Sequence, residues 1–130
     1  MAKVLLDTSV VIDFLRRKDK EKSALFLLAE DENQLFASII THTELYAGKS
    51  VWENQEALKE IELLFSGINL LLLDELTSKE AGRIRANYQT NLLDAIIAAT
   101  ALRHSLSLAT LNVKDFEMIK KLQILHRSML

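Results

Sequence analysis

Residues 3–13, with the sequence KVLLDTSVVID, decide the fold of this 130-residue chain. A short apolar run covers residues 4–6 and ends at Asp7, and a segment with the apolar spacing of a helix follows at once. A short strand that leads directly into a helix is typical of a crossover unit. This segment therefore predicts that a parallel sheet, covered by helices, begins at the N-terminus.

The same alternation of short apolar runs and helical segments continues along the chain. Strands are expected near residues 4–6, 35–38, 69–73, 106–110 and 123–125. Helices are expected at residues 10–17, 21–31, 42–47, 53–65, 78–88 and 92–103. The prediction is one α/β domain over residues 1–130, in which a central parallel sheet of about five strands is flanked by helices.

Composition agrees with a single globular domain and excludes several other classes of protein. Apolar residues make up 49% of the chain and charged residues 26%, which argues against a disordered or low-complexity protein. The chain has no cysteine, so disulfide scaffolds, thiolate zinc sites and a cysteine nucleophile are excluded. The first apolar run is too short for a secretory signal, and no stretch approaches the ~20 apolar residues of a membrane span. We therefore expect a soluble, cytoplasmic protein.

The overall charge argues against a protein that coats nucleic acid. Sixteen Lys and Arg stand against eighteen Asp and Glu, which gives a net charge of −2. Any polyanion must therefore be bound by a local group of cations. One basic run, which includes Arg16, Arg17 and Lys18, follows the first expected helix. It is either a solvated connection between helices or a contact to a phosphate backbone.

Acidic residues lie at the junctions between expected strands and helices. They are Asp7, Glu44, Asp94 and Asp115. Acids at helix starts often only cap the helix, and residues 41–44, THTE, have the form of a capping box. Asp7 precedes the helix expected at residues 10–17, and Asn91 is a possible cap before Asp94. In an open parallel sheet, however, strand ends and helix starts meet in a crevice where ligands bind. The four acids are therefore either separate caps or parts of one pocket.

Electrostatics favours a cation if the four carboxylates converge. Two carboxylates ~4 Å apart repel each other by ~4 kcal/mol at an effective dielectric constant of ~20, whereas a helix cap contributes ~1 kcal/mol. A pocket of this kind needs a cation or protonation. Because the ligands would be carboxylate oxygens, without Cys and without His at metal-ligand spacing, Mg²⁺ or Mn²⁺ is the expected ion.

Four segments carry a resemblance to a known family. They are LLDTSVVID at residues 5–13, SIITHTELYAG at 38–48, DAIIAATA at 94–101 and TLNVKDF at 110–116. In this order and spacing they resemble the PIN-domain ribonucleases, and within them the VapC-type toxins of toxin–antitoxin pairs. The resemblance implies a flavodoxin-like, or PIN-like, parallel sheet. It also implies an endoribonuclease that depends on Mg²⁺ or Mn²⁺, one or two ions, and cleaves single-stranded RNA.

The resemblance also implies roles for individual residues. Asp7 and Asp94 correspond to the principal metal ligands, Asp115 to a ligand or a support for a second ion, and Glu44 to an acidic partner that acts through water. Thr8, Thr110 and Asn112 correspond to polar supports of the active site. Some relatives carry an acid at the position of Asn112, where this chain has an amide.

The apolar helices either pack into the core, which is the default interpretation, or form a groove for a partner segment or a dimer face. A stripe of apolar side chains includes Trp52, Leu58 and Phe65 and exceeds what one small sheet needs. The resemblance implies both a homodimer and a small antitoxin protein laid across the helices. The alternative is a non-catalytic, PIN-like interaction module whose acids only cap helices and whose apolar helices dock a partner.

Overall fold

A computed structural model describes residues 2–125; residue 1 and residues 126–130 of the expected domain lie outside the described residues. Its core is a five-stranded sheet in the order β3-β2-β1-β4-β5, with every neighbouring pair parallel. The strands are β1 (Lys3–Leu6), β2 (Gln34–Ser38), β3 (Asn69–Leu71), β4 (Ser107–Ala109) and β5 (Ile124–Leu125). The prediction of a parallel α/β sheet is confirmed.

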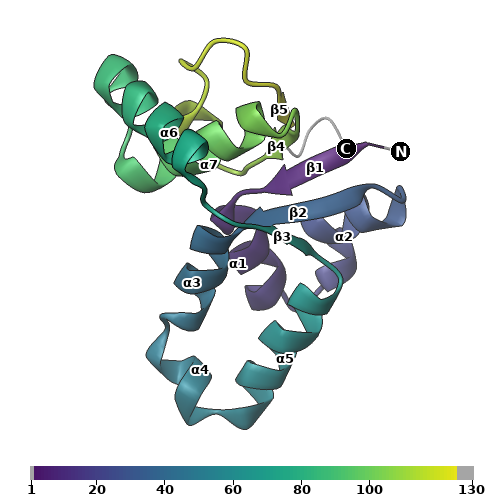
Figure 1. Ribbon diagram of the computed structural model, residues 1–130. Coiled ribbons are helices and arrows are strands. Elements are labelled where there is room, and N and C mark those ends of the chain that lie inside the picture. The colour runs from purple at the N-terminus through teal and green to yellow at the C-terminus, as the bar shows by residue number, and fades with distance from the viewer. Residues whose placement is uncertain (1, 126–130) are drawn as a thin grey trace.

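Helices cover both faces of the sheet, as Figure 1 shows. The helices are α1 (Thr8–Arg16), α2 (Ala24–Glu30), α3 (Ile39–Tyr46), α4 (Lys49–Glu53), α5 (Gln55–Ser66), α6 (Glu75–Tyr88) and α7 (Leu92–Arg103), with short 3₁₀ turns η1 (Lys20–Lys22) and η2 (Val113–Asp115). Helices α6 and α7 lie on one side, and α1 to α5 on the other (Figure 1). None of the helices within residues 2–125 is long and apolar enough to cross a membrane.

Strand β1 separates two apolar cores. Val4 and Leu6 belong to the cluster under α1, α2 and α5, whereas Leu5 belongs to the cluster under α6 and α7. All three side chains are fully buried. Successive side chains of a strand point to opposite faces of the sheet, so a strand covered on both sides needs consecutive apolar residues. This is why residues 4–6 contain no polar position.

The strand order places a crevice at the end of β1. Strand β1 pairs with β2 on one side and with β4 on the other. From β1 the chain moves outward in one direction to β2 and β3, and later in the other direction to β4 and β5. Ligand sites of open parallel sheets lie at such a reversal, beyond the carboxyl ends of the strands. Asp7 and Thr110 directly follow the two strands concerned.

Two expectations about helix starts were wrong. Helix α3 begins at Ile39, because Ser38 Oγ accepts a hydrogen bond from Ile40 N at 3.0 Å. Thr41 therefore lies inside the helix, and Glu44 does not belong to a capping box. The helix expected at 53–65 is α5, which begins two residues later because Asn54 caps it through its side chain, and the short helix α4 before it was not expected. The other boundaries differ from the expected ones by a few residues.

Candidate active site

Asp7 is a buried carboxylate held by two hydroxyl groups. Asp7 is only 4% exposed, and its Oδ2 accepts hydrogen bonds from Ser9 Oγ at 2.7 Å and Thr110 Oγ1 at 2.8 Å. Asp7 occupies the N-cap position of α1, but its side chain makes no capping hydrogen bond. The capping interpretation of Asp7 is therefore wrong, and its carboxylate bonds instead to residues on α1 and after β4.

The two hydroxyl groups also fix the chain after β4. Thr110 Oγ1 accepts a hydrogen bond from Asn112 N at 2.9 Å, and Ser9 Oγ accepts one from Leu111 N at 3.1 Å. Thr110 thus supports Asp7 directly, and Asn112 contributes its backbone. Ser9 was not among the residues expected to support the site. A serine two residues after an acid at a strand end indicates a hydrogen-bond partner of that acid, because short hydroxyl side chains bond readily to neighbouring groups.

Glu44 is held by a chain of two threonine hydroxyl groups. Thr8 Oγ1 donates to Glu44 Oε1 at 2.8 Å and lies 2.9 Å from Thr41 Oγ1. A carboxylate only accepts hydrogen bonds, so the single hydroxyl hydrogen of Thr8 points to Glu44 and Thr41 donates to Thr8. Thr41 is fully buried. This chain connects the start of α1 to the middle of α3.

Asp94 lies in the first turn of α7 and forms a reciprocal pair with Asn91. Asn91 Oδ1 accepts a hydrogen bond from Asp94 N at 2.8 Å, and Asn91 Nδ2 donates to Asp94 Oδ2 at 2.9 Å. Asn91 is the N-cap of α7, as the sequence suggested. Its second bond, to the carboxylate itself, was not expected.

The pKa of Asp94 shows that the four acids lie near one another. Partial burial, followed by the charges of Asp7 and Asp115, raises the pKa of the Asp94 carboxyl from 3.8 to about 6. The charge of Glu44 acts in the same direction, and the hydrogen bond from Asn91 acts against it. Carboxylates from three other segments of the chain therefore act on Asp94 electrostatically.

One cavity of about 820 Å³ contains all four acids on its wall. Asp7 follows β1, Glu44 lies within α3, Asp94 lies in the first turn of α7, and Asp115 belongs to η2. Other parts of the wall are apolar at Leu92 and Leu93 and basic at Arg16 and Arg17. A volume of this size holds more than an ion, because small-molecule sites measure about 300–1,000 Å³.

The donor chemistry of the cavity fits a hard divalent cation. Within the described part of the chain, no three Asp, Glu, His or Cys side chains are grouped closely enough to hold an ion together. Mg²⁺, however, is usually held by one or two carboxylates and completes its shell with water and phosphate oxygens. Asp7 and Asp94, which both line the cavity and whose charges repel each other, are the pair that would hold such an ion.

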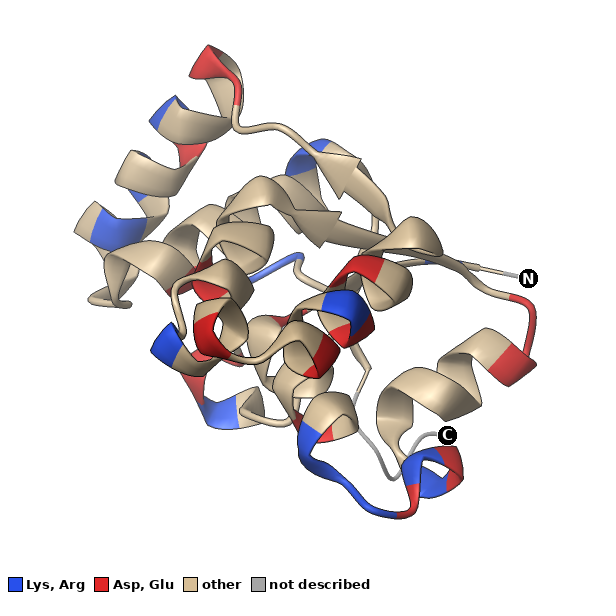
Figure 2. Cartoon of the chain, turned by 90° about the horizontal axis from the view of Figure 1, so that it is seen from below, with Lys and Arg blue, Asp and Glu red and all other residues tan. Residues whose placement is uncertain are grey.

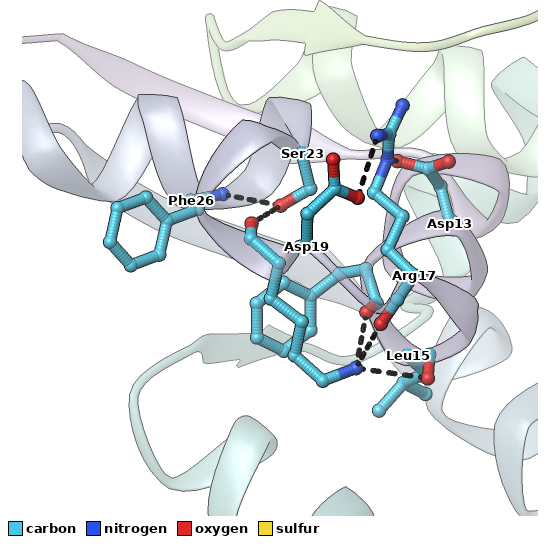
Figure 3. A network of polar contacts seen from close by, with 8 residues as sticks. Asp13, Leu15, Arg17, Asp19, Ser23 and Phe26 are labelled. Carbon is cyan, nitrogen blue, oxygen red and sulfur yellow. Dashed lines mark hydrogen bonds and ion pairs between the residues drawn. The ribbon is translucent and has the colours of Figure 1, made fainter.

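The basic run after α1 divides into residues with different surroundings. Arg16 and Arg17 line the cavity, and Lys18 does not. Arg17 Nε contacts Asp13 Oδ2 at 3.0 Å, and its Nη1 contacts Asp19 Oδ1 at 3.4 Å (Figure 3). Figure 2 shows basic and acidic segments interspersed over the helices rather than one uniformly basic face. The cations near the cavity are therefore few.

Lys20, in the same run, stabilises the end of α1. Its Nζ donates to the carbonyl oxygens of Phe14 at 2.7 Å, Leu15 at 3.0 Å and Arg17 at 3.2 Å (Figure 3). These carbonyl groups have no partner within the helix, so a cation there satisfies them. Lys20 thus has a structural role.

A second, mostly apolar cavity of about 480 Å³ lies on α3 and α4. His42, Tyr46 and Trp52 line it, and the His42 ring lies 4.7 Å from Tyr46 and 4.8 Å from Phe65. The predicted apolar stripe is therefore divided: Phe65 is buried, but Trp52 lies on α4 and is 66% exposed. This surface is separate from the acidic cavity, since the two share no lining residue.

Comparison with known proteins agrees with this architecture. The PIN domain family matches residues 4–122. Ribonuclease VapC19 of Mycobacterium tuberculosis is 33% identical over 127 residues, which cover 92% of this chain and 96% of that protein. DNA-bound VapBC from Salmonella typhimurium has a TM-score of 0.82 and 26% identity, and covers 98% of this chain and 99% of that chain. A toxin–antitoxin complex from Klebsiella pneumoniae has a TM-score of 0.76 and 28% identity, over 95% and 97% of the two chains. The chain therefore belongs to the PIN domain family, and VapC proteins are among its relatives.

Proposed function

We propose that this protein is an endoribonuclease, the toxin of a toxin–antitoxin pair, which hydrolyses RNA phosphodiester bonds with the help of a divalent cation. The observation that carries the proposal is the convergence of four carboxylates on one cavity at the carboxyl ends of β1 and β4. Its kinship with VapC proteins supports the choice of RNA as the substrate.

Asp7 and Asp94 are the residues that would hold Mg²⁺ or Mn²⁺, with Asp115 as a third ligand or as the support of a second ion. When bound, such an ion polarises the scissile phosphate and lowers the pKa of the attacking water. Thr110 and Ser9 keep the buried Asp7 carboxylate in place for this task. The proposal includes one or two ions. Asn112 has an amide at a position where an acid would strengthen the site of a second ion, so the second ion would be held less tightly.

Glu44 is the residue we assign to the attacking water. Thr8 donates to its Oε1, so Oε2 is the atom that orients the water and accepts its proton. The buried Thr41 fixes Thr8 in turn. Thr8 therefore supports the active site through Glu44.

Arg16 is our first candidate for a contact to the RNA backbone. It is exposed, lines the cavity and forms no ion pair within residues 2–125, whereas Arg17 is already paired with two aspartates. Lys18 lies off the cavity wall and has a weaker case. Such contacts position the RNA and do not read its sequence.

An antitoxin is the partner we propose for the aromatic cavity on α3 and α4. Exposed Trp52 and the rings of His42 and Tyr46 offer an apolar surface suited to an amphipathic segment. The similar Klebsiella structure is a toxin–antitoxin complex, which supports this partner. A homodimer is part of the same proposal, and sedimentation of the purified protein tests it.

Cleavage of a fluorescently labelled single-stranded RNA tests the proposed activity. We expect cleavage with Mn²⁺ or Mg²⁺, none with a chelator, and a loss of at least 100-fold in Asp7→Asn and Asp94→Asn, because each removes a ligand. Asp31→Asn, which alters an exposed acid at the end of α2, is the matched control and should cleave normally.

Equal cleavage by Asp7→Asn and the unaltered protein would contradict the assignment of this site. If no RNA is cleaved and Mn²⁺ shows no saturable binding in calorimetry, the chain is a non-catalytic interaction module instead. The exposed aromatic surface is the feature that would then carry its function.

A further inference from the structure

We propose that Asn91 is a positioning residue that holds the Asp94 carboxylate in one orientation and so makes the cation site selective for six-coordinate ions. The inference rests on the proposed function, since it concerns the same carboxylate. It extends that function by naming the residue that governs which divalent ion the site prefers.

Two hydrogen bonds join Asn91 and Asp94. One, from Asp94 N to Asn91 Oδ1, starts helix α7, and the other, from Asn91 Nδ2 to Asp94 Oδ2, fixes the carboxylate. Ser, Thr or Asp would supply the first bond equally well, because each is a good N-cap. Asp has no side-chain donor for the second bond, and Ser or Thr would have to make both bonds through a single oxygen atom. An amide at position 91 therefore does something that capping alone does not require.

Asp7 also has only its Oδ2 hydrogen-bonded to side chains of the described residues, but the donors are different residues. Asp7 Oδ2 accepts from Ser9 and Thr110, as Asp94 Oδ2 accepts from Asn91. Within residues 2–125, no side chain donates a hydrogen bond to Oδ1 of either aspartate. Each acid thus has one oxygen that is hydrogen-bonded to the protein and one that receives no side-chain hydrogen bond from the described part of the chain, so a ligand that takes both oxygens competes with those bonds.

One available oxygen on each acid favours particular ions. Mg²⁺ demands near-octahedral geometry with single oxygen ligands, whereas Ca²⁺ takes six to eight oxygens and readily accepts both oxygens of one carboxylate. A carboxylate whose second oxygen is tied to an amide is poorly suited to binding through both. Asn91 therefore disfavours Ca²⁺ relative to Mg²⁺ and Mn²⁺.

Three variants separate the positioning role from the capping role. Asn91→Ser keeps the cap and removes the amide group that bonds to the carboxylate, while Asn91→Ala removes the cap as well. Asn54→Ser makes the same exchange at the N-cap of α5, where the asparagine bonds only to the backbone amides of Glu56 and Ala57. Calorimetric titration with Mn²⁺ and with Ca²⁺, together with thermal unfolding in chelator, is measured for each.

Asn91→Ser should bind Mn²⁺ about tenfold more weakly than the unaltered protein, as is usual when a residue that orients a metal ligand is lost. Its Ca²⁺ affinity should fall less, so the ratio of Mn²⁺ to Ca²⁺ affinity drops severalfold. Its Tm should stay close to that of the unaltered protein, while Asn91→Ala loses about 4 °C. Asn54→Ser should change neither affinity.

Unchanged Mn²⁺ affinity and ion preference in Asn91→Ser would overturn the inference and leave the proposed function intact. A fall in Tm as large as that of Asn91→Ala would assign any weaker binding to the lost cap and would also overturn it. No saturable Mn²⁺ site in the unaltered protein, by contrast, would overturn the proposed function and this inference together.

Discussion

The acids of the cavity differ in how the protein surrounds each one. Asp7 is buried and receives two hydroxyl hydrogen bonds, whereas Asp94 is half-buried and receives one amide hydrogen bond. Donors stabilise a buried carboxylate in its charged form, and nearby carboxylates destabilise it. For Asp94, burial and the repulsion by nearby carboxylates outweigh the hydrogen bond from Asn91, so its pKa rises to about 6. The charge of this residue therefore costs folding free energy when no cation is bound.

Asp94→Asn should be more stable than the unaltered protein at pH 7.5 in chelator. The folded state binds the Asp94 proton more tightly than the unfolded state does, so stability falls as pH rises from about 4 to about 6 and the full cost remains above that range. We expect a Tm about 2–4 °C higher for the variant at pH 7.5 and no difference at pH 3.5. Equal Tm values at pH 7.5 would contradict this reasoning.

Thr110→Val should destabilise the protein by about 1–3 kcal/mol, because it leaves the buried Asp7 carboxylate and the Asn112 amide each without one partner. Urea unfolding measures the change. Thr110→Ser keeps the hydroxyl group and is the control, which should lose less. A valine variant as stable as the serine variant would show that the hydroxyl group does not matter.

At the scale of elements, polar residues at helix starts determine where the helices begin. Ser38, Asn54 and Asp74 each accept a backbone hydrogen bond with the side chain and begin α3, α5 and α6. Helix α3, which begins at Ile39 and not at residue 42, carries Glu44 on the cavity wall. The cap at Ser38 therefore belongs to the helix that positions this acid.

Ser38→Ala should lower the free energy of unfolding by about 1 kcal/mol, because it removes the cap of α3. Thr43→Ala is the control on the same helix, since Thr43 is exposed and its hydroxyl bonds only to the carbonyl of Ile39. Urea unfolding of both variants checks the difference. If the two substitutions cost the same, Ser38 is not the residue that starts the helix.

Strands were predictable from the sequence to a greater extent than helix starts and polar contacts. Residues 4–6 predict a buried strand, because a strand that is covered on both faces of the sheet needs consecutive apolar residues. Helix α4 was missed because five residues contain too little apolar periodicity to identify a helix. The four acids were identified as candidate site residues from their place at the junctions between strands and helices. The hydrogen bonds from Ser9 and Asn91 could not be predicted, because they depend on side-chain orientation, which only the folded chain defines.

At the scale of the whole molecule, charge is the property that most limits RNA binding. The net charge is −2, and the acidic cavity itself repels phosphate when no cation is present. On the proposed function, RNA binding would therefore depend on a bound cation and on the few arginines at the cavity wall. A weak dependence of affinity on salt follows, because few phosphates are neutralised by side chains.

Arg16→Ala should reduce the slope of log affinity against log salt concentration by about 0.7, the value for one phosphate contact on a single strand. The measurement uses fluorescence anisotropy with a labelled, cleavage-resistant RNA analogue in Mg²⁺, so that the acidic residues stay unaltered. Lys18→Ala is the control and should leave the slope unchanged, because Lys18 does not line the cavity. An unchanged slope in Arg16→Ala would remove this residue from the RNA contact.

Anomalous X-ray scattering from crystals grown with Mn²⁺ tests the central claim most directly, namely that acids from distant segments form one cation site at the ends of β1 and β4. The predicted result is a manganese peak within about 2.5 Å of one oxygen each of Asp7 and Asp94. A saturated crystal with manganese only elsewhere, or with none, would contradict the claim.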